Sequence, residues 1–130
     1  LAALRALIEP ELSSRALPKV HFALIERLEA TNDLIADAVG RRDASAYIRH
    51  NLEFHRILYL RAQAPAMLAM LETVWLQLGP TMNTLYLRLG RTGVPRGHRL
   101  IIEALKAGDE PGLRLAVRTD VTQGLRLLAG

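Results

Sequence analysis

Two polar residues one helical turn apart are the first candidates for chemistry in this 130-residue chain. Asn51 and His55 are four residues apart, so on a helix their Cβ atoms lie about 5–6 Å apart on one face. That face continues through apolar or amphipathic side chains, namely Tyr47, Ile48, Leu58 and Tyr59. We therefore expect the pair to point into the protein interior. It could share a metal ion, although a hydrogen-bonded core pair is the commoner use of this spacing.

Two further polar residues each interrupt a mostly apolar stretch. His98 stands at the start of one such segment, and Asp120 lies near the end of another. Either could be a ligand, but a histidine in water at a helix start and a surface carboxylate are the commoner roles of these residue types. Spacing alone does not place either beside Asn51 and His55.

The elements that must position these residues are helices. Apolar residues recur at spacings of three and four almost everywhere, and the alternation typical of strands is missing. The expected helices run from Leu1 to about Leu17, Pro18 to Val39, Ala44 to Arg61, Pro65 to Leu89, Val94 to Ala107, and Glu110 to Leu128. Their short connections predict an all-α, antiparallel helical bundle of about six to seven helices, forming one domain over residues 1–130.

Glycine and aspartate mark two of the predicted helix ends. Gly40 is placed to end the second helix in the left-handed conformation, and Asp43 to cap the third. Gly108 and Asp109 repeat this arrangement between the last two helices.

Prolines mark other boundaries. Pro18 and Pro65 suit the first turn of a helix, whereas Pro10 and Pro80 fall inside helical patterns and should kink or split the helix. The fourth helix is therefore expected to be two if Pro80 divides it.

The composition is that of a folded globular protein, with 50% hydrophobic and 23% charged residues. The absence of cysteine excludes disulfides and thiolate metal sites, and it fits a reducing, cytoplasmic location. No apolar run reaches the length of a membrane span, and no signal peptide pattern is present, so no membrane partner is expected.

The net charge of +4 raises the question of nucleic acid binding. The arginines are scattered among acidic residues, and no helix pair resembles a helix-turn-helix with a basic recognition face. A solvated, arginine-rich surface is the favoured interpretation, so we expect this chain not to bind DNA by itself.

Four segments together resemble the C-terminal effector-binding domain, FCD, of FadR-subfamily GntR transcription regulators. They agree with that family in order and spacing: Arg5 to Pro10 with R-x-x-[LI]-E-P, Asn51 to His55 with [DN]-x-x-F-H, His98 to Asp109 with H-x-x-[IL]-x-x-A-[LI]-x-x-G-D, and Ala116 to Val121 with A-x-x-x-H-[LI]. The chain also opens on Leu1, without Met and already within a helical rhythm, as if an upstream segment had been removed.

The resemblance implies a helical bundle that holds a divalent metal through an Asp and three His. When the family's ligand positions are carried over to this sequence, the implied metal ligands are Asn51, His55, His98 and Asp120. Two depart from the commonest pattern, since Asn51 replaces the Asp and Asp120 replaces the last His. Two oxygens and two nitrogens make a harder, weaker site, for which zinc or nickel is expected and manganese or magnesium becomes plausible.

The resemblance also implies partners. These are a small carboxylate effector, a second copy in a homodimer, and DNA, reached only through an N-terminal winged helix-turn-helix that this chain lacks. Arg5 matches the family's first-helix arginine, and its planar guanidinium suits an effector carboxylate, with a salt bridge to Glu9 as the alternative. Other arginines are expected to be mostly solvated: Arg88, Arg91, Arg96 and Arg99. Large side chains could line a cavity or form ordinary core: Trp75, Tyr47, Tyr59, Tyr86 and Met82.

The leading functional hypothesis is a ligand-sensing domain that controls an attached DNA-binding domain. A structural dimerisation bundle without metal is the alternative. A metal-dependent hydrolase is a third, less favoured one, because Glu53 should point to another face and leaves the proposed ligands without a general base. No enzymatic activity is therefore expected.

Overall fold

The structure, a computed structural model, describes residues 1–78 and 97–129. In chain order the elements are helix α1 (Ala2–Ala16), the 3₁₀ turn η1 (Leu17–Lys19), α2 (Phe22–Gly40), α3 (Ala44–Tyr59), the 3₁₀ turn η2 (Leu60–Ala62), α4 (Pro65–Leu76), α6 (Gly97–Ala107) and α7 (Glu110–Ala129). The described residues contain helices and no strand, which confirms the predicted all-α class.

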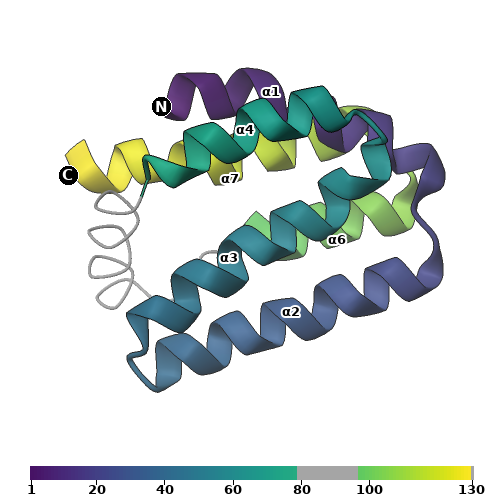
Figure 1. The fold of residues 1–130 in the computed structure, drawn as a ribbon. Helices are drawn as coiled ribbons and strands as arrows, with labels where there is room; N and C mark the ends of the chain where they lie inside the picture. Colours follow the sequence, from purple (N-terminus) through teal and green to yellow (C-terminus); the bar gives the residue numbers. More distant parts are fainter. Residues whose placement is uncertain (79–96, 130) are drawn as a thin grey trace.

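The helices pack side by side as a bundle, in which α1 runs against α7, α2 against α3, and α6 against α7 (Figure 1). The first pair is antiparallel, because Ser14 near the end of α1 donates to Glu110 at the start of α7, 2.7 Å away. Figure 1 accordingly shows the start of α1 and the end of α7 at the same end of the bundle. Between the helices lies an apolar core whose fully buried members include Leu12, Leu28, Phe54, Leu58, Leu71, Ile101, Leu113 and Val117.

The second helix begins and ends later than predicted. Pro18 lies in the 3₁₀ turn η1, which extended backbone at Val20 separates from α2. At the other end Gly40 still belongs to α2, and Arg42 is the left-handed residue, with φ 57°. The amide of Asp43 donates to the carbonyl of Ala38, and that of Arg42 to Val39, which closes the helix as a Schellman motif. The prediction of a left-handed Gly40 was therefore wrong.

The other predicted helix signals are confirmed in the described part of the chain. Asp43 caps α3 by accepting from the amide of Ala46 at 3.0 Å. Gly108 is left-handed with φ 64°, and the Asp109 side chain accepts from the amide of Gly112.

The prolines give a mixed result. Pro65 is the first residue of α4, as expected. Pro10 lies inside α1, which continues from Ala2 to Ala16 and is not split in two. α4 ends at Leu76, well before the predicted Leu89. Pro80, the predicted second half of this helix and the start of the next at Val94 lie outside the described residues, as do Met82, Tyr86, Arg88, Arg91 and Arg96.

A search of the described helices for membrane spans found none with the length and hydropathy that crossing a bilayer requires.

Candidate metal centre

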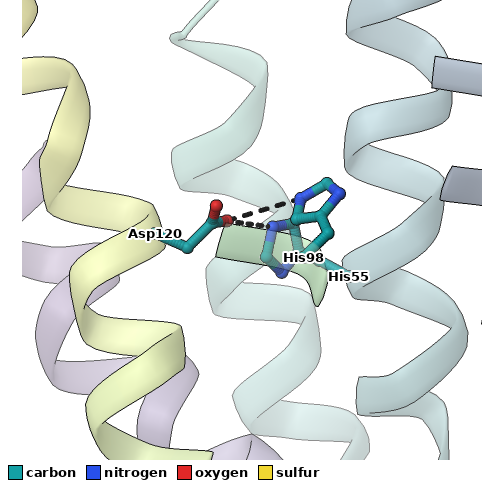
Figure 2. Close-up of side chains that lie close together, drawn as sticks. All are labelled: His55, His98 and Asp120. Atoms are coloured by element: carbon teal, nitrogen blue, oxygen red, sulfur yellow. Dashed lines mark hydrogen bonds and ion pairs between the residues drawn. The ribbon is translucent and has the colours of Figure 1, made fainter. Parts of the chain in front are cut away.

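Three of the four predicted ligands meet in the middle of the bundle. His55 comes from α3, His98 from α6 and Asp120 from α7. Each offers one ligand atom, and these atoms all lie within 4.8 Å of one another. Nε2 of His55 is 2.9 Å from Oδ2 of Asp120, and Nε2 of His98 is 3.5 Å from the same oxygen (Figure 2). Three helices that are distant in sequence therefore deliver their donors to one point.

All three side chains are buried. His55 is fully buried, His98 is 6% exposed and Asp120 is 9% exposed. The sequence left open a solvated histidine at a helix start and a surface carboxylate, and the structure excludes both. The backbone explains why Asp120 fits here, because the residue before His98 is Gly97, which has no side chain to occupy the space that the carboxylate fills.

Asn51 lies beside this cluster, one helical turn before His55. It is half-buried and lines a small recess with residues from α2, α3, α6 and α7, namely Asn32, Ile35, Tyr47, His98, Asp120 and Gln123. The volume of the recess is about 10 Å³, roughly that needed by one water. The fourth predicted ligand therefore borders the same space as the other three.

Asp120 remains ionised in spite of its burial. Burial raises the pKa of its carboxyl, but electrostatic interaction with His98 and hydrogen bonds with His55 and His98 outweigh burial and hold the pKa far below its usual range. The negative charge acts on its neighbour Tyr47, whose pKa is raised by burial and then further by Asp120. The cluster therefore contains a buried anion, for which a cation is the natural partner.

The second nitrogen of each imidazole is held from the other side. Nδ1 of His55 is 3.1 Å from the hydroxyl of Tyr59, and Nδ1 of His98 is 3.3 Å from Oδ1 of Asn32. The ring of His98 also stacks on Phe54, with centroids 4.0 Å apart and planes within 2° of parallel. Both rings are thereby turned so that Nε2 faces Asp120.

The donors fit a divalent cation. One imidazole nitrogen from each of His55 and His98 faces the buried carboxylate of Asp120, so that three donor atoms surround one position. Two imidazole nitrogens and one carboxylate oxygen are a set that zinc, nickel or manganese accepts, with further positions left for Asn51, water or a ligand. His55, His98 and Asp120 would hold the ion.

A second buried polar group adjoins the first. Glu9 is fully buried and paired with Arg5, whose pKa is raised because Glu9 outweighs the opposing effect of burial. The carboxylate of Glu9 also accepts hydrogen bonds from the hydroxyl of Tyr59 at 2.8 Å and from the indole nitrogen of Trp75 at 3.2 Å. The alternative considered for Arg5, a salt bridge to Glu9, is thus what the structure contains. Contact of Arg5 with an effector stays a prediction.

The sequence did not link Glu9, Tyr59 or Asn32 to the histidine cluster, which the structure shows them to adjoin. Tyr59 lies four residues after His55 on the same helical face, which was a usable signal. Glu9 was expected only as part of the first motif and as a salt-bridge partner of Arg5, because its other partners, Tyr59 and Trp75, come from other helices. Nothing in the sequence singled out Asn32.

The chain is similar to known proteins in both sequence and fold. A family model of the FCD domain matches residues 1–123. The chain is similar to the HTH-type transcriptional regulator McbR of Escherichia coli strain K12, with 24% identity over 107 residues that make up 80% of this chain and 48% of that protein. It thus spans about half the length of this curated relative. The solved structure of E. coli McbR/YncC covers 98% of this chain with 65% of its own length, at a TM-score of 0.86 and 23% identity, which shows a shared fold.

Proposed function

The chain belongs to the FCD domain family, and from this premise we propose that it is the effector-sensing domain of a bacterial transcription regulator of the GntR type. In this proposal it binds a small organic acid through a divalent metal and controls an attached winged helix-turn-helix. The domain senses and does not catalyse. In keeping with this, Glu53, the acidic residue nearest the proposed ligands in sequence, is exposed and pairs with His50.

The convergence of His55, His98 and Asp120 carries the proposal. A metal held there would supply a buried positive charge with a free position for a carboxylate oxygen. Asn51 is proposed as the fourth ligand because it borders the same recess. Two nitrogens favour zinc or nickel, whereas the oxygens of Asp120 and Asn51 leave manganese and magnesium open.

The recess beside Asn51, as the described residues form it, is too small for an organic effector. Pockets for organic ligands are typically of about 300–1,000 Å³, far above the recess beside Asn51. An acid bound within this recess would therefore move side chains or helices around the metal. Such a ligand prefers the widened arrangement over the closed one, and this difference in affinity is what allows binding to alter an attached domain. Arg5 is proposed to contact the acid after releasing Glu9.

The proposed partners follow from the same premise. They are a second copy of the chain, forming a homodimer, and DNA contacted by the N-terminal domain of the full regulator, acting in the cytoplasm. McbR is an HTH-type transcriptional regulator, which supports this arrangement for a longer protein that contains the chain.

The first test is elemental analysis of the purified chain after loading with zinc and dialysis against metal-free buffer. The expected result is stoichiometric zinc, lost in a His55→Ala/His98→Ala variant and retained in His50→Ala, a control that removes a half-buried histidine from the same helix α3, one that pairs with the exposed Glu53. A melting-temperature screen of the loaded chain against small carboxylic acids then identifies the effector class, because a ligand that binds only the folded state raises the melting temperature.

A metal-free outcome would favour the structural dimerisation bundle. One observation supports that alternative: among the described residues, every buried side-chain nitrogen and oxygen already has a hydrogen-bond partner. Absence of bound metal, together with no thermal shift by any acid, would contradict the sensing function.

A further inference from the structure

Beside the three proposed ligands, a chain of hydrogen bonds leaves His55 in the direction away from Asp120. Nδ1 of His55 meets the Tyr59 hydroxyl at 3.1 Å, and that hydroxyl meets Oε1 of Glu9 at 2.8 Å. All three side chains are buried, with exposed fractions of 0%, 1% and 0%. Water does not reach these groups to replace a missing partner, so the order of donors and acceptors in the chain matters.

The direction of each bond follows from which groups can donate. The carboxylate of Glu9, paired with Arg5 and accepting from Trp75, can only accept, so the hydroxyl proton of Tyr59 points to it. The tyrosine oxygen is then an acceptor toward His55. Nδ1 of His55 must carry a proton, and this assigns Nε2 as the nitrogen that faces Asp120 and the metal position.

From this geometry we propose that Tyr59 is a positioning residue for the metal centre. Its hydroxyl, oriented by Glu9, holds His55 in the tautomer and ring orientation that present Nε2 to the metal. The inference rests on the proposed metal site and adds a residue from outside the ligand set. Partners of this kind on metal-binding histidines typically contribute 10- to 100-fold in affinity.

The relay has no equivalent on the other histidine. His98 relies on the amide of Asn32 and on stacking against Phe54, and it has no carboxylate behind the amide in the described structure. His55 is therefore the more firmly oriented ligand, and the hydroxyl of Tyr59 is the group whose removal tests this.

The experiment compares the wild-type chain with Tyr59→Phe, which removes one oxygen and keeps the ring. Zinc affinity, measured by competition with a chromophoric chelator, is expected to fall about 10- to 100-fold. Ser13→Ala is the matched control, since it removes another fully buried hydroxyl, one that donates to the carbonyl of Pro10 in the same helix. The control is expected to bind zinc as the wild type does.

A second measurement does not depend on the stability of a variant. Nitrogen NMR of the histidine side chains in the wild type is expected to find Nδ1 of His55 protonated, with and without zinc. In Tyr59→Phe this protonation is expected to be less complete, because the nearest remaining acceptor, Oε1 of Glu9, lies 3.7 Å from Nδ1. Unprotonated Nδ1 in the wild type, or equal zinc affinity in a folded Tyr59→Phe variant, would overturn the role of Tyr59. Failure of the wild type to take up zinc would instead refute the proposed metal site, and the NMR result would still decide whether the relay exists.

Discussion

Gly97 lies so close to Asp120 that a Cβ atom added to residue 97 would stand 2.1 Å from Oδ1 and 2.9 Å from Cγ of the carboxylate. Asp120 cannot move without losing its contacts, because its Oδ2 lies 2.9 Å from Nε2 of His55 and its Oδ1 accepts a hydrogen bond from Gln123. The absence of a side chain at one position of α6 thus sets where α7 places its carboxylate.

Gly97→Ala is therefore expected to displace Asp120 and weaken metal binding severely. The overpacking should also lower the free energy of unfolding by about 1–3 kcal/mol. Zinc titration and urea denaturation check both effects. Gly40→Ala is the control, because a Cβ there meets no atom within 4 Å. Full zinc affinity in Gly97→Ala would show that Asp120 is not a ligand at this position.

Phe54→Leu tests whether stacking orients His98. The substitution keeps an apolar side chain in a fully buried position but removes the ring that lies parallel to the imidazole. Stability is expected to fall by less than the about 3–5 kcal/mol typical of Phe→Ala, and zinc affinity should fall because His98 can turn.

Leu113→Ala provides the comparison for Phe54→Leu. It empties a fully buried position of α7 two turns before Asp120 and should reduce stability without reducing zinc affinity. Equal affinity losses in the two variants would mean that general loosening of the core, and not ring stacking, is responsible.

Trp75 is the only tryptophan of the chain and donates to Glu9 at 3.2 Å. Its indole is thus connected to the metal position through Glu9, Tyr59 and His55. Zinc is expected to change the tryptophan emission with the same stoichiometry as metal uptake. The His55→Ala/His98→Ala variant should give no change, and Tyr59→Phe a smaller one. If zinc binds but the tryptophan emission does not change, this connection between Trp75 and the metal position is contradicted.

The stability of the contact between α1 and α7 is expected to depend on pH, because the carboxylates of Glu11 and Glu110 take part in it. A hydrogen bond from Arg114, followed by one from Arg15, lowers the pKa of Glu11, and bonds from Ser14 and Arg114 lower that of Glu110. Because the folded pKa values lie below the ordinary 4.5, this contribution to stability is present above that pH and is lost as the pH falls through the folded values.

Arg114→Ala should raise both carboxyl pKa values, which carboxyl NMR titration measures. The urea midpoints of the wild type and the variant should differ slightly at neutral pH and converge in acid. Added salt should reduce the difference between the two midpoints, since these groups are partly exposed to solvent. Unshifted carboxyl titrations in the variant would contradict the assignment.

Local sequence signals predicted the helices well because capping is a local property. Asp43 caps α3 and Gly108 ends α6 through neighbours only a few residues away. Gly40 misled the prediction because the chain closes α2 two residues later, at Arg42, and no single-residue preference fixes that register.

The candidate site depended on a different kind of information. The four-residue rule links Asn51 to His55 within one helix, but it does not bring His98 and Asp120 to them, since these lie on α6 and α7. Only the family motifs suggested a shared site. The burial of Glu9 could not be foreseen, because it depends on how α3 and α4 pack against α1.

The polar side chains around the centre come from every described α-helix: Glu9 from α1, Asn32 from α2, His55 from α3, Trp75 from α4, His98 from α6 and Asp120 from α7. Contacts between positions as distant as 9 and 75, or 55 and 120, close late in folding because each must first overcome the entropy of a long loop. A partly assembled bundle would therefore lack the centre. Bound metal should then slow unfolding while leaving the rate of folding nearly unchanged, which makes occupancy of the site a determinant of the lifetime of the native state.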